Sequence, residues 1–153
     1  MENSSKYIVF QLNDQSYGVD VHQVMSIEKM SSITEVPKTS KLVKGVMNHH
    51  SEVIPIIDLK ERLQLGNSTY TETTRLLIVN IHQTQFGLIV DAATDVIDIN
   101  PSIVDDAPDV VGGLDRSFLK GLAKLEEGLL ILLDLDYILK TEELNEVKEI
   151  IGN

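Results

Sequence analysis

The sequence contains no cysteine and no tryptophan, and only 5% of its residues are aromatic. The absence of cysteine excludes disulfide bonds, thiolate catalysis and cysteine-ligated zinc. Aliphatic side chains must therefore fill the core of a chain that is 42% hydrophobic. No apolar run approaches the roughly 18 residues of a membrane-spanning helix, and no basic stretch followed by a long apolar run marks a secretion signal. We expect a cytoplasmic protein, folded as one domain or as two small subdomains that share a core.

Positive charge is also scarce, because 13 Lys and Arg residues stand against 24 Asp and Glu residues, for a net charge of −11. Such a chain repels phosphate backbones, so we expect no nucleic-acid partner. The same repulsion disfavours direct binding to anionic membrane surfaces. The negative charge suits a soluble protein, with or without basic protein partners.

Motifs for catalysis are missing as well, since no nucleophile elbow, phosphate-binding loop or dinucleotide fingerprint is present. The four histidines are His22, His49, His50 and His82, and they show no zinc-binding spacing. On a strand, the adjacent His49 and His50 would point to opposite faces. We therefore expect no metal and no cofactor, and a binding module rather than an enzyme.

The most informative stretch covers residues 45–63, GVMNHHSEVIPIIDLKERL. Its apolar run, residues 53–57, has the length and the β-branched residues of a strand that is covered on both faces. Pro55 has no backbone N–H to donate, which predicts a sheet edge or a bulge at that position. Asp58 ends the run and can cap a helical turn after it.

The same pattern recurs at residues 121–139, GLAKLEEGLLILLDLDYIL. Gly45 precedes Asp58 by the same number of residues as Gly121 precedes Asp134. A repeated structural cap explains the two aspartates better than a pair of acid–base catalysts would. We expect burial of the apolar residues in both runs, above all Ile54, Ile56, Leu130 and Leu132.

An earlier pair of segments also matches without gaps, residues 8–18 (IVFQLNDQSYG) and residues 77–87 (LIVNIHQTQFG). In the first of them Ile8, Phe10 and Leu12 should share one face of a strand. Two matches in the same order indicate a duplication of roughly 70–75 residues.

The remaining chain fits an all-β protein, because short apolar strands alternate with turn residues at regular intervals. Residues 64–74 are the expected boundary between the two copies. Residues 21–30 fit a short helix or a strand equally well. Residues 141–151 predict a C-terminal helix with Thr141 as its N-cap.

The order of these pieces resembles the CheW family of chemotaxis coupling proteins over roughly residues 7–139. The matching segments read YIVFQL with YGVDV, ITEVP, KGVMN, EVIPIIDLKERL, FGLIVDAATDV and KGLAKLEEGLLILLDLDYIL. The resemblance implies a mainly β fold of two tandem SH3-like, five-stranded β-barrels that share a hydrophobic core. The implied CheW-like domain covers residues 6–140, with residues 13–74 as the first barrel and residues 6–12 with 75–140 as the second. Residues 141–153 would then form the short C-terminal helix and tail.

The resemblance also implies a function without catalysis. Members of the family couple methyl-accepting chemoreceptors to the histidine kinase CheA, whose regulatory domain has the same fold. The chain would then be a cytoplasmic adaptor, a monomer in isolation, recruited to receptor arrays at the membrane. A related possibility is the coupling domain of a CheV-type protein, which carries a receiver domain after the coupling region. A small metal-dependent enzyme using His49, His50 and a carboxylate is the alternative from a different class.

Site residues follow from the resemblance position by position. The family's kinase-binding positions match Val24, Ser26 and Gly45, and its second kinase or ring contact matches Asp105 and Val110. Its receptor-binding positions match Asn48, His50, Leu77, Gly87, Ala93 and Val96. The largest departure lies in the segment that usually reads Asn-Leu-Arg-Gly, where this chain has Asn48, His49, His50 and Ser51. Histidine carries only part of a charge near neutrality, so a permanent cation is missing there. The basic residue usual at position 105 is also replaced by Asp105.

Overall fold

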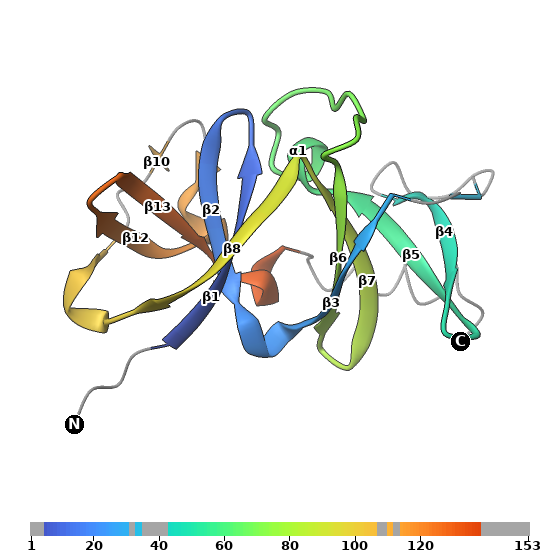
Figure 1. The fold of residues 1–153 in the computed structure, drawn as a ribbon, viewed down its shortest axis with the longest axis horizontal. Coiled ribbons are helices and arrows are strands. Elements are labelled where there is room, and N and C mark those ends of the chain that lie inside the picture. The colour runs from blue at the N-terminus through green and yellow to red at the C-terminus, as the bar shows by residue number, and fades with distance from the viewer. Residues whose placement is uncertain (1–4, 31–32, 35–42, 107–109, 112–113, 139–153) are drawn as a thin grey trace.

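The computed structural model describes residues 5–30, 33–34, 43–106, 110–111 and 114–138 (Figure 1). The helix predicted at residues 141–151 lies outside the described residues. The strands are β1 (Ser5–Leu12), β2 (Gln15–Asp20), β3 (Val24–Lys29), β4 (Val43–His49), β5 (Glu52–Asp58), β6 (Arg75–Ile81), β7 (Thr84–Val90), β8 (Ala92–Ile99), β9 (Val104–Asp105), β10 (Val110–Val111), β11 (Leu114–Asp115), β12 (Leu119–Leu125) and β13 (Gly128–Leu133). The helical turns are η1 (Val21–Gln23), α1 (Leu59–Arg62), η2 (Pro101–Ile103), η3 (Arg116–Phe118) and η4 (Leu135–Tyr137). The predicted mainly β fold is confirmed.

Two main sheets form two SH3-like barrels that stand side by side (Figure 1). Barrel A has the strand order β8-β1-β2-β13-β12-β9, and barrel B has the order β3-β6-β7-β5-β4. A short ribbon pairs β10 with β11. The chain passes from barrel A to barrel B at η1 and returns between β7 and β8.

The division of the chain between the barrels differs from the one expected from the sequence. Residues 13–74 were expected to form one barrel, and residues 6–12 with 75–140 the other. Instead β2 stays in barrel A beside β1, and the hairpin β6–β7 belongs to barrel B. The reason is local, because a two-residue turn holds two antiparallel strands next to each other. Residues 64–74 separate the two repeats in sequence, yet they join α1 to β6 within barrel B.

The strand register confirms the internal repeat. β13 runs parallel to β2 with Leu132 opposite Gly18, and β5 runs parallel to β7 with Ile56 opposite Gly87. Leu132 and Ile56 each lie two residues before the aspartate that ends the run. The two barrels also share the order of equivalent strands, since β3, β6, β7, β5 and β4 correspond to β8, β1, β2, β13 and β12.

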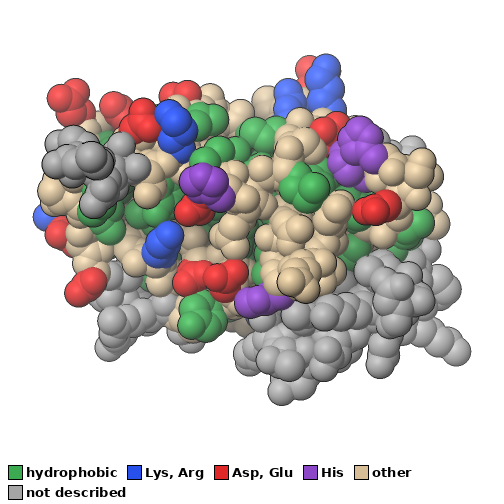
Figure 2. Space-filling view, turned by 90° about the horizontal axis from the view of Figure 1, so that it is seen from below, with side chains coloured by type: hydrophobic (Ala, Val, Ile, Leu, Met, Phe, Trp, Pro, Cys, Tyr) green, Lys and Arg blue, Asp and Glu red, His purple; other side chains and the backbone are tan. Residues whose placement is uncertain are grey.

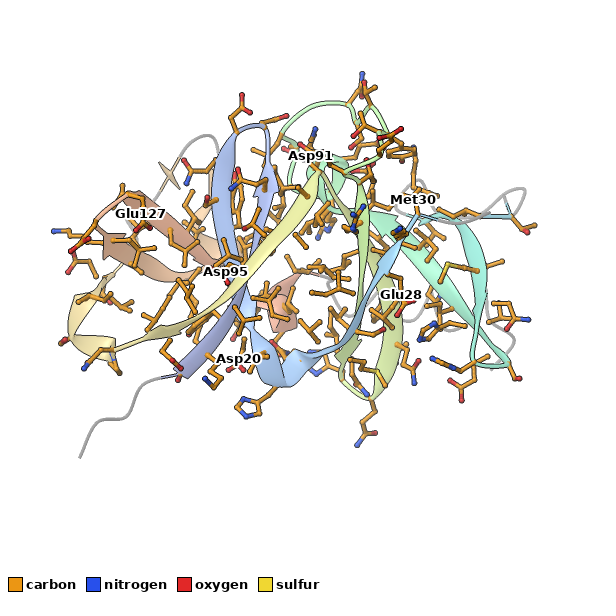
Figure 3. The ribbon with its side chains drawn as sticks, viewed as in Figure 1. Asp20, Glu28, Met30, Asp91, Asp95 and Glu127 are labelled. Carbon is orange, nitrogen blue, oxygen red and sulfur yellow. The ribbon has the colours of Figure 1, made fainter. Side chains whose placement is uncertain are left out.

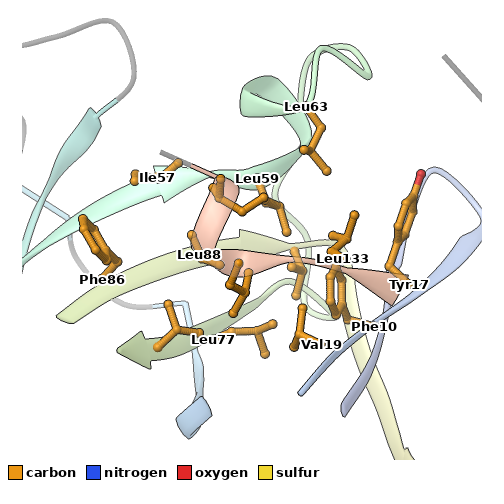
Figure 4. Close-up of a cluster of buried hydrophobic side chains, with 14 of the residues drawn as sticks. Phe10, Tyr17, Val19, Ile57, Leu59, Leu63, Leu77, Phe86, Leu88 and Leu133 are labelled. Atoms are coloured by element: carbon orange, nitrogen blue, oxygen red, sulfur yellow. The ribbon is translucent and has the colours of Figure 1, made fainter. Parts of the chain in front are cut away.

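A central cluster of buried side chains lies between the barrels (Figure 4). It includes Ile8, Phe10, Leu12, Tyr17, Val19, Ile131 and Leu133 from barrel A, and Val43, Ile57, Leu77, Val79, Ile81, Phe86, Leu88 and Val90 from barrel B. The prediction that Ile8, Phe10 and Leu12 share one face is confirmed. Full burial of one such side chain contributes roughly 1.5–3 kcal/mol, so this cluster binds the barrels together.

Each barrel also has a small core of its own, on the other face of the same strands. Ile54 and Ile56 pack inside barrel B, whereas Leu130 and Leu132 pack inside barrel A. All four are at most 2% exposed, as predicted. Because side chains alternate along a strand, β5 and β13 serve one barrel core and the central cluster at once. Continuous apolar runs are required at these two strands for that reason.

Pro55 is accommodated without a sheet edge. It faces Val46, whose N–H and C=O bond to Thr34 at 2.8 and 2.9 Å instead of to β5. The pairing of β5 with β7 begins only at Ile56. The ladder therefore does not need an N–H at position 55, although β5 is an interior strand. A bulge does occur nearby, at Lys44 of the neighbouring strand.

The two aspartates at the ends of the apolar runs are caps, as predicted. The Asp58 carboxylate accepts from the backbone N–H of Glu61 at 3.2 Å, and Asp134 accepts from that of Asp136 at 3.1 Å. Buried Asp58 also accepts from the hydroxyls of Ser68 and Tyr70, at 2.8 and 2.9 Å. Partial burial and the nearby Asp58 charge raise the pKa of Tyr70 far above its usual value. The segment that follows α1 is thus fixed to the barrel.

Candidate functional site

The predicted kinase-binding residues Val24 and Ser26 lie half-buried on β3, at one edge of barrel B. Val24 packs against the central cluster. A bulge separates the two, so Met25 between them is 53% exposed. The Ser26 hydroxyl is buried and has no hydrogen-bond partner. This part of β3 therefore combines an exposed apolar side chain with a buried hydroxyl that has no hydrogen-bond partner.

Gly45 is buried beneath the chain's own segment at residues 33–34. A Cβ atom at this position would lie 2.5 Å from the Thr34 carbonyl oxygen and 2.6 Å from Ile33 Cγ2. The backbone N–H and C=O of Thr34 both form hydrogen bonds with Val46, which hold the segment in place. The close approach that requires glycine here is thus an approach of this chain to itself.

The predicted second contact lies at the equivalent edge of barrel A. Asp105 pairs with Leu122 in β12, next to Gly121, as Thr34 pairs with Val46 next to Gly45. The Asp105 carboxylate is 2.9 Å from Lys124 Nζ, and both side chains are more than half exposed. Backbone pairing places Val110 in the β10–β11 ribbon.

The predicted receptor-binding residues separate into buried and accessible positions. Leu77 is fully buried in the central cluster, and Gly87 is buried in β7. A Cβ atom at Gly87 would lie 2.5 Å from Ile56 Cδ1. A partner cannot reach either position directly, so both residues contribute to the packing of the protein interior. Ala93 is half-buried, and Val96 on β8 is 49% exposed.

Sequence reasoning did not select Ile27, which is 41% exposed on β3. The strand register makes Ile27 the repeat equivalent of Val96, because β3 pairs with β6 as β8 pairs with β1. Burial alternates along β3 in the structure and places Met25 and Ile27 on the exposed face, but the sequence alone did not reveal this because residues 21–30 fit a helix or a strand equally well. Each barrel therefore presents an apolar side chain on an equivalent edge strand.

The remaining predicted residues lie at the end of β4, for Asn48, and in the turn between β4 and β5, for His50. Asn48 and His50 are exposed, and His50 and Ser51 have φ values of 50° and 67°. Two positive φ values identify a type I′ turn. The rings of His49 and His50 are in edge-to-face contact with centroids 4.1 Å apart. The rule that neighbouring strand residues point to opposite faces does not apply here, because the strand ends at His49 and His50 is already in the turn.

Asp20 and His22 lie where the chain first crosses between the barrels, and the face seen in Figure 2 carries histidine side chains at several separate places among acidic ones. Asp20 accepts from the backbone N–H of His22 at 2.8 Å and contacts its Nδ1 at 2.9 Å. Partial burial opposes ionisation of Asp20, but these bonds and the Lys120 charge outweigh it and hold the pKa of the carboxyl below its usual value. Among the described residues, no three His, Asp or Glu side chains are grouped to hold a metal ion. No helix of the described chain is long and apolar enough to span a membrane.

The two barrels, with exposed apolar edge strands and a common core, define a protein-interaction module of the scaffold class. The chain belongs to the CheW family, because the family model described as CheW-like domain matches residues 6–143. It is similar to the chemotaxis protein CheW of Bacillus subtilis, with 35% identity over 93% of this chain and 91% of the relative. The chemotaxis protein CheW of Klebsiella aerogenes is 31% identical over 91% of this chain and 84% of its own length. The crystal structure of the scaffolding protein TtCheW from Thermoanaerobacter tengcongensis superposes with a TM-score of 0.84 at 32% identity, covering 94% of this chain and 92% of that one. The family resemblance and the two-barrel fold are therefore confirmed.

Proposed function

We propose that this protein is a non-catalytic adaptor that couples methyl-accepting chemoreceptors to the histidine kinase CheA. It would act in the cytoplasm as a monomer that joins receptor arrays at the membrane, without metal or cofactor. One observation carries the proposal, namely the pair of equivalent edge strands, β3 and β8, which expose Met25 and Ile27 on one barrel and Val96 on the other. Two partners can then bind one rigid body, because the central cluster joins the two barrels.

The receptor contact is proposed to involve Ala93 and Val96 of β8 together with Ile27 of β3. These side chains offer apolar anchors to a helical hairpin, in the manner of a helix bound to an apolar surface. Asn48, near the end of β4, and His50, in the β4–β5 turn, are both exposed and supply polar groups to the same partner. Leu77 and Gly87 contribute by packing beneath the contact, because both are buried.

The kinase contact is proposed to lie around Val24 and Ser26 of β3, with Gly45 of β4 packed against residues 33–34, which follow β3 along the chain. Asp105, on the β9 edge of barrel A, and Val110, in the β10–β11 ribbon, are proposed for the second kinase contact. Rigid coupling of this kind shifts a kinase equilibrium only by the difference in contact energy between its two states, typically about 1–3 kcal/mol.

Calorimetric titrations with a receptor cytoplasmic fragment and with the kinase regulatory domain, each alone, test the proposal. Val96→Glu should weaken receptor binding about tenfold or more, or about 1.4 kcal/mol, and leave kinase binding unchanged. Met25→Glu should show the opposite selectivity. Leu129→Glu is the matched control for receptor binding, because Leu129 is as exposed as Val96 but lies on β13, outside the proposed receptor contact. An equal loss of affinity for both partners in any of these variants would contradict the proposal. Failure of the wild type to bind the two partners would contradict it as well.

A further inference from the structure

The chain returns from barrel B to barrel A at Asp91, and this residue is bonded to both barrels. Its carboxylate oxygen Oδ2 accepts from the backbone N–H of Asn13, in the β1–β2 turn of barrel A, at 2.9 Å. The same oxygen lies 2.9 Å from Lys60 Nζ on α1, which follows β5 of barrel B. The Asp91 N–H donates to the Gln11 carbonyl in β1, and its carbonyl accepts from the Thr73 hydroxyl before β6, both at 3.0 Å. We call Asn13, Lys60 and Asp91 the Asp91 clamp.

The clamp is built around a buried cation. The Lys60 side chain is only 8% exposed, and Asp91 is 31% exposed. An ammonium group in such a place is stable only when a carboxylate pairs with it, since an uncompensated buried charge is strongly destabilising. The Asn13 side-chain amide also donates to the Leu65 carbonyl after α1, at 2.8 Å. The turn of barrel A is thus held to barrel B by two separate bonds, one through Asp91 and one through Leu65.

The internal repeat supplies a comparison at the other crossing, where His22 is equivalent to Asp91, Asp136 to Lys60 and His82 to Asn13. There His22 bonds to its own neighbour Asp20, and its side chain is 86% exposed. Gln23 reaches Asp136 at 3.0 Å, and His82 Nε2 lies 3.3 Å from the Asp136 carbonyl, both in exposed positions. Asp91 and Asp20 mark the two crossings at opposite ends of the contact between the barrels (Figure 3). One crossing is therefore fixed by a buried ion pair, and the other by exposed bonds.

We propose that Lys60 and Asp91 are positioning residues that set the orientation of the two barrels and thereby the spacing of Ile27 and Val96. This inference rests on the proposed receptor contact, which spans both barrels. Asp91 immediately precedes β8, so the strand that carries Ala93 and Val96 starts from the clamp. Loss of the ion pair leaves the exposed crossing and the central cluster to fix the angle, and the barrels then sample a wider range of orientations.

A distance measurement between the barrels tests the clamp directly. The chain has no cysteine, so Glu52→Cys in barrel B and Glu126→Cys in barrel A give two unique sites for spin labels. Both residues are exposed next to hairpin turns. Lys60→Met and Asp91→Asn should each broaden the distance distribution relative to the doubly labelled parent. Lys60→Met also removes the buried charge, so it remains informative if Asp91→Asn does not fold.

Two further variants distinguish positioning from general loss of structure. Lys60→Arg keeps the ion pair and should restore the narrow distribution. Asp98→Asn removes the partner of Lys6 in an ion pair of 3.0 Å that lies entirely within barrel A, at 61% exposure of both side chains, and should change nothing. An unchanged distribution in both Lys60→Met and Asp91→Asn would refute the clamp.

The binding readout separates the two partners. Lys60→Met should weaken binding of the receptor fragment about tenfold, or about 1.4 kcal/mol, because the receptor contact spans both barrels. Binding of the kinase regulatory domain should stay at the wild-type value, because neither of its two proposed contacts, one on β3 and one at Asp105 and Val110, spans both barrels. A broadened distribution with wild-type receptor affinity would overturn the positioning role. A wild-type chain that does not bind the receptor fragment would refute the proposed function instead, and the distance distributions would still decide whether the clamp holds the barrels.

Discussion

Gly87 offers a test of how closely the interior of barrel B is packed. A Cβ atom at Gly87 would lie 2.5 Å from Ile56 Cδ1, and the next contacts, with Ile78 and Leu76, are at 3.6 and 3.8 Å. The conflict therefore involves a single methyl group. Overpacking of this kind typically costs about 1–3 kcal/mol, so Gly87→Ala should lower the free energy of unfolding by that amount.

The same geometry predicts that the cost can be relieved. Ile56→Val removes the Cδ1 atom and alone should cost about 0.5–1.5 kcal/mol. In the double variant the new methyl group occupies the vacated space, so the combined cost should be smaller than the sum by about 1 kcal/mol or more. Urea unfolding midpoints at constant slope measure all three variants against the wild type.

Gly18 provides the matched control, because it occupies the equivalent position in barrel A. A Cβ atom there would lie 3.1 Å from the nearest methyl of Leu132 and 3.2 Å from that of Leu130. Gly18→Ala should therefore cost less than Gly87→Ala. Costs of Gly87→Ala and Ile56→Val that add to within about 0.5 kcal/mol would refute the argument.

Four other outcomes are expected. Ser51→Gly should stabilise the protein by about 0.5–1 kcal/mol, because Ser51 has φ of 67°, whereas Ser51→Ala should bring no gain in the same unfolding assay. Gly45→Asp should lower the free energy of unfolding by about 1–3 kcal/mol by displacing Thr34 and should also weaken kinase binding, so unchanged kinase affinity would remove Gly45 from the site. His50→Arg should leave receptor affinity within about tenfold of the wild type. The wild type should bind the receptor fragment equally at about pH 6 and about pH 8, because a neutral imidazole still donates one hydrogen bond. A steep pH dependence that vanishes in the arginine variant would show that the turn needs a cation. The pKa of Asp20 is lower in the folded state than its usual value of 3.8. The ionised carboxylate therefore contributes its full stabilisation above pH 3.8 and loses it as the pH falls through the lowered pKa. Asp20→Asn should destabilise the protein at neutral pH but not in strong acid.

The core and the repeat could be predicted from the sequence because both depend on short-range patterns. Side-chain alternation placed Ile8, Phe10 and Leu12 on one face, and the matched spacing around Asp58 and Asp134 identified equivalent strands. These signals need no knowledge of which strand pairs with which.

The barrel boundaries and part of the candidate site could not be predicted in this way. The hairpins β1–β2 and β6–β7 follow from local turns, but the barrel that each hairpin joins is set by the parallel pairing of β2 with β13 and of β7 with β5, which local patterns do not specify. Gly87 and Leu77 matched receptor-binding positions, but their burial is a property of the assembled barrels. A glycine such as Gly45 signals a close approach, and only the structure shows that Thr34 makes it.

The exchange of strands between the two repeats bears on how such a protein arose. Each barrel takes its β1–β2-type hairpin from one repeat and its remaining strands from the other. One repeat alone thus holds the hairpin of one barrel and three strands of the other, and it leaves both open. An ancestor with a single repeat would have closed its barrels only by exchanging hairpins with a second copy. Joining two copies in one chain supplies both hairpins at once, so each barrel is closed by the hairpin of the other repeat.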